Sequence, residues 1–273
     1  MIEFKIFYAC NGYEENLINA CKYSVLSARR FLDREDIIVS FHPPYDAEMI
    51  DKIIEIDEFA IIELNQHHIG KPFNIHPLSD EWKDNDRYYG EKINIRDVDS
   101  ENVLLLDCDT LIINELSPLF EGDFDFGGRA MDLIENQWQN NSNLIIPTKR
   151  VLRLIKNKNV HMWAGAYCVF KNNFHKLIGD EWLDYYNNKR DILDYTCKPN
   201  RKTYDQSALI PAVHHNTNKI KLLNDTGYIL NLNAKYNKND LDDDVIILHG
   251  NNLVDELDLR EELDMLSKKL KNL

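Results

Sequence analysis

Short apolar runs alternate with amphipathic stretches along the first half of the chain. Apolar residues at helical spacing from Leu17 to Leu32, and again over Tyr88–Val98, predict helices. Strands that alternate with helices form a mostly parallel sheet, and ligands bind at the carboxyl ends of its strands. Four short, mainly apolar runs have the length of buried β-strands: Lys5–Cys10, Ile37–Phe41, Ala60–Leu64 and Val103–Leu106.

The second half has a less regular pattern. Phe174–Asn188 and Tyr204–Val213 are predicted helices, and a last helix carries Leu259, Leu263, Leu266 and Leu270 on one face. The predicted strands of this half are Phe124–Gly128, Ala164–Phe170 and Val245–His249. No repeat or clear linker interrupts the pattern, so we expect residues 1–273 to form a single domain. We expect it to have two functional halves, residues 1–110 and residues 111–273.

The amino-acid composition excludes some classes of binding partner and indicates the environment of the protein. The 273 residues carry 32 basic and 46 acidic side chains, a formal net charge of −14. Such a surface repels phosphate backbones, which argues against nucleic-acid binding. No signal peptide or apolar run long enough to span a bilayer is present, so we expect a cytoplasmic protein without a transmembrane segment. The five cysteines are widely spaced and form no CxxC pair, which favours reduced core thiols over disulfides or structural zinc.

The strongest local signal is VLLLDCDTLIIN, residues 103–114. Asp107 and Asp109 follow a buried strand, and alternate residues of an extended chain share one side. Their carboxylates therefore converge where Mg²⁺ or Mn²⁺ can bind. A strand followed by DxD is typical of nucleotide-sugar glycosyltransferases and of haloacid-dehalogenase-type phosphatases. The phosphatase motif ends in Thr or Val, where this chain has Leu111.

Five ordered motifs resemble glycosyltransferases of the GT-A fold, especially the glycogenin-like family 8 group. That resemblance implies a Rossmann-like mixed sheet flanked by helices, with a C-terminal helix. The motifs are FYACNGYEENLINACKYSVLSARRF, YYGEKINIRDVDSENVLLLDCDTLI, MWAGAYCVFKNNF, YDQSALI and VIILHGNN.

The resemblance implies that residues 1–110 bind a nucleotide and that residues 111–273 bind a sugar and its acceptor. The nucleotide site would lie in the first two motifs. Ala9 and Asn11 would approach the base and ribose, and Tyr13 would stack on the base. Lys92 matches a position that faces the phosphates in the family. A solvated helix face is the simpler alternative for Lys92.

The later motifs imply a metal ligand and a sugar site. His249 ends a strand and matches the third metal ligand, beside Asp107 and Asp109; an imidazole among carboxylates favours Mn²⁺ over Mg²⁺. A purely structural histidine is the alternative. The donor-sugar residues implied by the resemblance are Ala164 and Gly165 in the wall of the site, with Asp205 and Gln206 facing the sugar. Asp205 would also suit a helix N-cap.

The function implied is a metal-dependent hexosyltransferase. It would move a sugar from a nucleoside-diphosphate sugar, UDP being the first candidate, with retention of anomeric configuration. The acceptor would be a glycan, a lipid or a protein. Two alternatives stay open: a haloacid-dehalogenase-type phosphatase, and a GT-A domain that binds a nucleotide sugar without transferring it.

Overall fold

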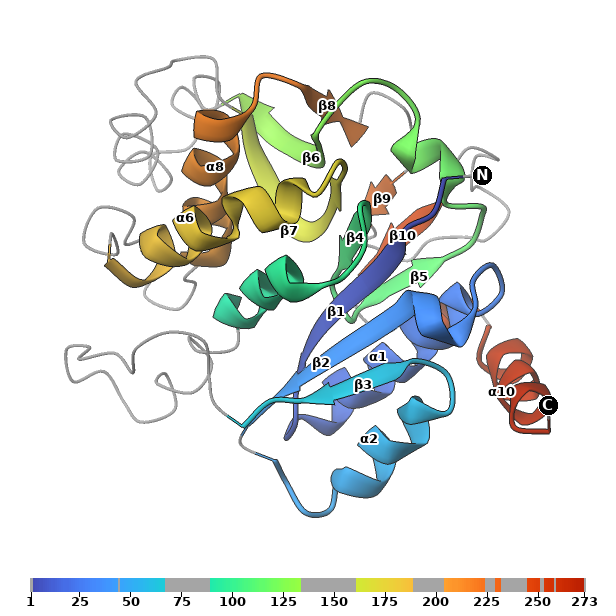
Figure 1. Cartoon of the computed structure of the whole chain (residues 1–273). Coiled ribbons are helices and arrows are strands. Elements are labelled where there is room, and N and C mark those ends of the chain that lie inside the picture. Colours follow the sequence, from blue (N-terminus) through green and yellow to red (C-terminus); the bar gives the residue numbers. More distant parts are fainter. Residues whose placement is uncertain are drawn as a thin grey trace.

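In a computed structural model, the described parts of the chain form two β-sheets and the helices around them (Figure 1). The described residues are 2–43, 45–66, 89–133, 161–188, 204–223, 229–231, 245–250, 253–257 and 259–272.

A seven-stranded mixed sheet forms the centre of the fold. Four neighbouring strands on one side run parallel, as the first half of the sequence predicted. One long strand from the second half then pairs antiparallel with two neighbours, so the whole sheet is mixed. In spatial order the strands are β3 (Ile61–Leu64), β2 (Ile37–His42), β1 (Lys5–Asn11), β4 (Val103–Leu106), β7 (His161–Phe170), β6 (Phe126–Leu133) and β8 (Ile220–Leu222).

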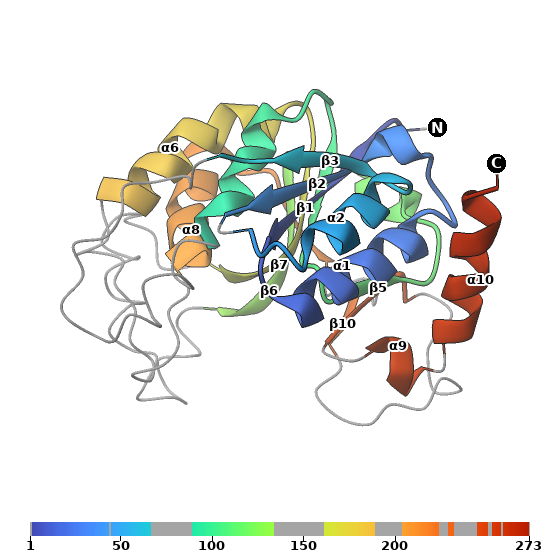
Figure 2. The same ribbon diagram turned by 90° about the horizontal axis from the view of Figure 1, so that it is seen from below.

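The central strands are apolar on both faces because helices cover both faces (Figure 2). All four residues of β4 are fully buried. The helices α1 (Glu15–Ala28) and α2 (Ile50–Asp57) cover one face, and the helices α9 (Leu253–Glu256) and α10 (Arg260–Leu270) belong to the same hydrophobic core. The other face packs against the 3-10 helix η2 (Tyr89–Asp97) and the helices α6 (Phe174–Asn188) and α8 (Tyr204–Asn216).

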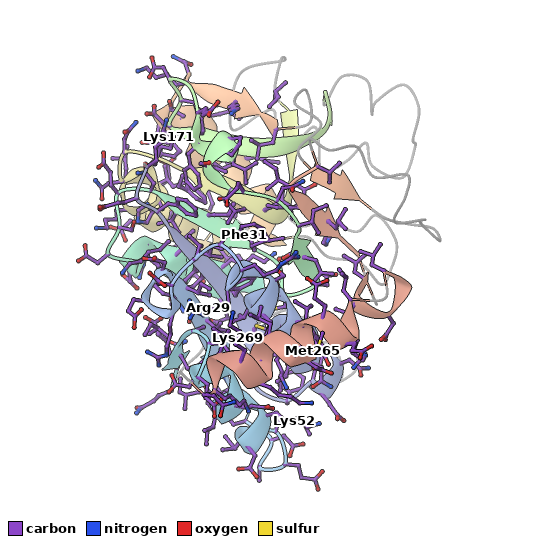
Figure 3. The ribbon with its side chains drawn as sticks, turned by 90° about the vertical axis from the view of Figure 1, so that its right-hand side faces the viewer. Arg29, Phe31, Lys52, Lys171, Met265 and Lys269 are labelled. Carbon is purple, nitrogen blue, oxygen red and sulfur yellow. The ribbon has the colours of Figure 1, made fainter. Side chains whose placement is uncertain are left out.

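The C-terminal helix α10 lies beside α1 (Figure 3). Leu263 is buried in the core, and Leu266 and Leu270 pack against it, which confirms the predicted apolar face. Met265 lies on the outer side and is 58% exposed. The first turn carries two acids and the last turn two lysines, an arrangement that suits the helix dipole.

A second, three-stranded sheet joins distant parts of the chain. Its order is β5 (Thr110–Ile112), β10 (Ile247–His249) and β9 (Ile229–Asn231). The strand β5 directly follows the DCD sequence and pairs antiparallel with β10. We did not predict β5, β8, β9 or α2 from the sequence, because each is short and its pattern is ambiguous.

The segment predicted as an α-helix over Tyr88–Val98 is instead the 3-10 helix η2. Gly90 and the β-branched Ile93 and Ile95 weaken its α-helical preference. Gly90 also lies so close to α6 that a Cβ atom there would be 2.6 Å from the ring of Tyr186. Tight packing thus favours the narrower helix, which buries Glu91 and Lys92 as well.

Two short 3-10 helices, η1 (Arg34–Asp36) and η3 (Ser117–Phe120), complete the described elements. No helix within the described part of the chain is both long and apolar enough to span a bilayer.

The burial of each leucine predicts how much its side chain contributes to the free energy of unfolding. Leu105 is fully buried in β4, so Leu105→Ala should lower the free energy of unfolding by about 2–5 kcal/mol through lost contacts and a cavity. Leu177, 63% exposed on α6, is the matched control, and Leu177→Ala should change it by less than about 0.5 kcal/mol. Urea denaturation followed by circular dichroism measures both. Equal losses in the two variants would contradict this account of the core.

Candidate active site

The carboxyl ends of β1 and β4 meet at one edge of the sheet. The two strands are parallel, and Tyr8 lies opposite Leu106, the last residue of β4. The chain leaves this edge at Asp107 on one strand and passes Asn11 at the end of the other. Parallel sheets bind ligands at this edge, so it is the expected position for a site.

Asp107, Asp109 and His249 come together here. Their ligand atoms all lie within 4.8 Å of one another. His249 Nε2 is 3.2 Å from Asp109 Oδ1. The β5–β10 pairing places His249 opposite Thr110, and the Gly250 N–H donates to the Asp109 carbonyl over 3.0 Å. The backbone of the second sheet therefore carries the imidazole to the carboxylates.

The partial burial of this cluster shifts its protonation equilibria. Desolvation raises the pKa of Asp107, and the positive charge of Lys92 opposes the rise only in part. Desolvation acts the same way on Asp109, but the hydrogen bond and charge of His249 outweigh it and lower the pKa of Asp109. For His249, desolvation lowers the pKa, yet the bond to Asp109 and the neighbouring carboxylates raise it overall.

Lys92 projects from η2 into the same cluster. Its Nζ atom lies 2.6 Å from Asp107 Oδ1, and the residue is only 4% exposed. The burial excludes the alternative that Lys92 sits on a solvated helix face. An ammonium group at this position places positive charge beside the two carboxylates.

These residues have the chemistry of a divalent-cation site. Two carboxylates offer the hard oxygen ligands that Mg²⁺ and Mn²⁺ prefer, and the imidazole adds a nitrogen ligand. All three donors come within reach of one point, and they include both charged oxygens and a nitrogen. Asp107, Asp109 and His249 thus fit a metal ion.

A buried histidine–glutamate contact borders this edge, and we did not predict it. His42 Nδ1, at the end of β2, lies 2.8 Å from Glu91 Oε2, and both side chains are 1% exposed or less. Ser40 Oγ is 3.3 Å from His42 Nε2 and accepts a 2.7 Å hydrogen bond from Asn65 Nδ2. The sequence marks each residue, since a histidine closes a mostly apolar strand and an acid directly precedes Lys92, but it does not indicate that the two side chains meet.

The end of β1 and the loop that follows it hold the predicted nucleotide residues. Asn11 is 2% exposed, and its Oδ1 accepts hydrogen bonds from the backbone N–H groups of Tyr13 (3.4 Å) and Glu14 (2.9 Å). These bonds fix the turn that leads into α1. Ala9 is buried in the core cluster that also contains Ile93 of η2. Tyr13 is half-buried.

The predicted donor-sugar residues lie on β7 and α8. Ala164 and Gly165 belong to β7, and Asp205 and Gln206 to the first turn of α8. The side chains of these four residues lie outside the described part of the structure. Their predicted roles stay predictions.

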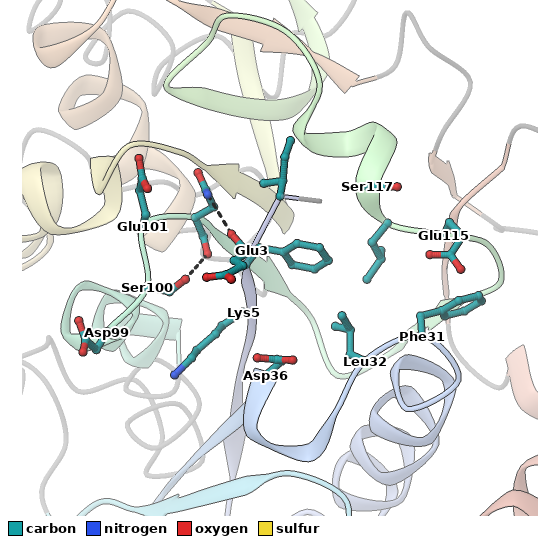
Figure 4. A pocket seen from close by; sticks show the side chains of 14 residues that line it. Glu3, Lys5, Phe31, Leu32, Asp36, Asp99, Ser100, Glu101, Glu115 and Ser117 are labelled. Atoms are coloured by element: carbon teal, nitrogen blue, oxygen red, sulfur yellow. Dashed lines mark hydrogen bonds between the residues drawn. The ribbon is translucent and has the colours of Figure 1, made fainter.

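A different cavity, of about 870 Å³, lies at the amino-terminal end of β1 (Figure 4). It combines apolar side chains with several carboxylates, and Asn102 Nδ2 donates to the Glu3 carbonyl in its wall. None of the predicted site residues lines it. The amino ends of the parallel strands are not where such sheets bind ligands, so the opposite edge is the candidate active site.

Comparison with solved structures shows that the chain has the fold of the GT-A glycosyltransferases. The bifunctional glycosyltransferase WbbM matches with a TM-score of 0.60 and 11% identity, over 97% of this chain and 50% of that chain. The galactosyltransferase LgtC, in complex with donor and acceptor sugar analogues, matches with a TM-score of 0.56 and 13% identity, over 97% and 96% of the respective chains.

The glycosyltransferase GlyE of Streptococcus pneumoniae TIGR4 matches with a TM-score of 0.52 and 15% identity, covering 97% of this chain and 61% of that one. This chain therefore spans about half of WbbM and nearly all of LgtC. No protein-family model and no curated protein matches the sequence. The predicted GT-A fold is confirmed.

The surroundings of His249 and His175 predict pKa shifts in opposite directions for these two histidines. In metal-free protein the pKa of His249 should lie above 6.5, and that of buried His175 below it. Asp109→Asn removes the stabilising charge, so it should lower the pKa of His249 and leave that of His175 unchanged. NMR titration of the imidazole nitrogens measures both. In the wild type this contact stabilises the fold below pH 6.5, and the stabilisation is lost as the pH rises through the raised pKa of His249. Asp109→Asn should abolish this pH-dependent stabilisation.

An unchanged His249 pKa in Asp109→Asn would show that the two side chains do not interact in solution.

Proposed function

We propose that this chain is a metal-dependent glycosyltransferase that uses a nucleoside-diphosphate sugar, with UDP the first candidate nucleotide. The observation that carries the proposal is the convergence of Asp107, Asp109 and His249 within 4.8 Å at the ligand-binding edge of a GT-A fold. Lys92 beside Asp107 supports it, because a second positive charge suits a diphosphate.

Asp107, Asp109 and His249 would hold a divalent cation, Mn²⁺ in preference to Mg²⁺. When bound, such a cation supplies Lewis-acid stabilisation of the charge on the leaving diphosphate. Asp109 and His249 bind each other without it, so metal binding must displace the proton held by His249. Metal affinity should therefore fall as pH drops below the raised pKa of His249.

Lys92 would exchange its contact with Asp107 for one with the diphosphate. Its buried position keeps the ammonium group from competing water, which strengthens its hydrogen bonds. The loop fixed by Asn11, with Ala9 and Tyr13, would form the base and ribose site. These roles rest on the family resemblance and on the common edge that the residues share.

Asp205 and Gln206 would face the donor sugar, and Ala164 and Gly165 would form part of its wall. A solved LgtC structure carries an active-site substitution of glutamine, which supports a role for the same residue type at Gln206. The resemblance also favours retention of anomeric configuration. LgtC binds an acceptor sugar analogue, which supports a glycan, free or on a lipid or protein, as the acceptor here.

Loss of one metal ligand should abolish transfer. Asp109→Asn should lower the rate of UDP release from a panel of UDP-sugars by more than about 100-fold, because several kcal/mol of transition-state stabilisation depend on the metal. Asp99→Asn alters a fully exposed acid outside the cluster and should leave the rate unchanged. The assay is run with Mn²⁺ and with a chelator, which should abolish the wild-type rate.

A wild-type rate in Asp109→Asn, with metal still required, would overturn this site. Calorimetric binding of UDP with Mn²⁺, but no UDP release with any acceptor pool, would indicate a binding domain without transfer. Hydrolysis of a generic phosphomonoester with Mg²⁺, lost in Asp107→Asn, would indicate the phosphatase, which needs a carboxylate nucleophile. The GT-A fold disfavours that last outcome.

Lys92 provides a separate test of the diphosphate site. Lys92→Met removes a charge-assisted hydrogen bond, so UDP affinity in the presence of Mn²⁺ should fall by about tenfold or more. Lys92→Arg keeps the charge and should retain most of the affinity. Calorimetry on folded protein measures both, with the melting temperature recorded in parallel. Equal UDP affinity in Lys92→Met and wild type would assign Lys92 a structural role alone.

A further inference from the structure

Three buried cysteine thiols form a cluster that includes Cys108, the central residue of the DCD sequence. The sulfur atoms of Cys10, Cys21 and Cys108 all lie within 4.8 Å of one another. They come from β1, from α1 and from the position between Asp107 and Asp109. Each of the three residues is 1% exposed or less. The three cysteines are far apart in the sequence but form one compact cluster in the fold.

The cluster has the composition of a site for a soft ion. Thiolates bind soft metals and metalloids in preference to hard cations such as Mg²⁺. Among the described residues, no histidine or carboxylate belongs to the group, so it offers three sulfur ligands. Cys168 is a useful contrast, because it is equally buried but packs in the hydrophobic cluster on the other face of the sheet.

The apolar surroundings of the three thiols favour an ion whose complex with three thiolates has no net charge. The three cysteines lie within a hydrophobic cluster, where a complex with net charge is strongly disfavoured. Three thiolates around a divalent ion carry a net negative charge, whereas three thiolates around a trivalent ion are neutral. A trivalent thiophilic metalloid, such as arsenic(III) in arsenite, fits both the ligand number and the dry environment.

We propose that Cys10, Cys21 and Cys108 form a binding site for a trivalent thiophilic metalloid, and that its occupation weakens metal binding at Asp107 and Asp109. The second part rests on the proposed function. Arsenous acid, As(OH)₃, reacts with three thiols to give one As(S)₃ centre and three waters. Three S–H and three As–O bonds break, three As–S and three O–H bonds form, and arsenic stays in the +III state.

A cavity next to the cluster provides a route for a small neutral molecule such as As(OH)₃. Its volume is about 580 Å³, and Cys108 and Asp109 lie in its wall together with Leu17 and Ala20 of α1. Cys21 follows Ala20 in the same helix. Cys108 thus separates this cavity from the two other thiols, and a local movement of its side chain would admit As(OH)₃ to the cluster.

The coupling follows from the position of Cys108 in the chain. Its Sγ atom donates to the Ala9 carbonyl over 3.3 Å, so it is already held against β1. An As–S bond would replace this contact and draw the sulfur atom of Cys108 closer to those of Cys10 and Cys21. Asp107 and Asp109 share peptide bonds with Cys108, so this shift of Cys108 would move the two carboxylates relative to each other.

The binding test uses reduced full-length protein and arsenite. X-ray absorption at the arsenic edge should show three As–S bonds and no As–O bond, with one arsenic per chain by native mass spectrometry. Cys21→Ala should weaken arsenite binding by about tenfold or more, because a chelating ligand is lost. Cys168→Ala, the matched buried control, should bind like wild type.

Retained As–O bonds, or equal weakening in Cys21→Ala and Cys168→Ala, would overturn the site. Cys10→Ala provides the same comparison if Cys21→Ala fails to fold.

The coupling test measures Mn²⁺ by electron paramagnetic resonance. Arsenite should lower the Mn²⁺ affinity of wild type by about tenfold or more and leave that of Cys21→Ala unchanged. Equal Mn²⁺ affinity with and without bound arsenic would refute the coupling. Absence of Mn²⁺ binding to arsenic-free protein would instead refute the proposed function, and the absorption spectrum would still decide whether the arsenic site exists.

Discussion

Two carboxylates at the end of one buried strand repel each other, and the site depends on how the fold offsets that repulsion. Two unit charges about 4 Å apart interact by about 4 kcal/mol at an effective dielectric constant near 20. Asp107 and Asp109 lie at this kind of separation, within 4.8 Å. Lys92 compensates one carboxylate from η2, and His249 compensates the other from β10.

Each compensating residue requires its own piece of tertiary structure. η2 is held against α6 by close packing at Gly90 and Tyr186. Within it, Lys92 reaches Asp107 while the preceding Glu91 contacts His42 at the end of β2. A buried 3-10 helix thus places a lysine at the end of β4 and a glutamate at the end of β2, the two strands that flank β1. From this one short segment the edge gains a positive charge beside Asp107 and a buried polar contact with His42.

Much of the fold and part of the site were predictable from local pattern. The strands β1, β2 and β4 and the helix α6 follow from apolar runs and helical spacing, and Asp107 and Asp109 follow from a buried strand that ends in acids. His249 was predicted through the resemblance, and the structure places it beside Asp109. The contact between His42 and Glu91 was not predictable, because nothing local indicates which buried polar residues will face each other.

The sequence alone determined the longer strands, most of the covering helices and the acids at a strand end, because hydrophobic periodicity and residue chemistry are local properties. Tertiary structure decided which distant residues meet. Antiparallel pairing with β5 carries His249 to the acids across more than a hundred residues, and the packing of α1 on β1 gathers three cysteines that the sequence keeps apart. These long-range contacts depend on the register of paired strands and on the packing of helices on the sheet, and both are set only when the whole chain is folded.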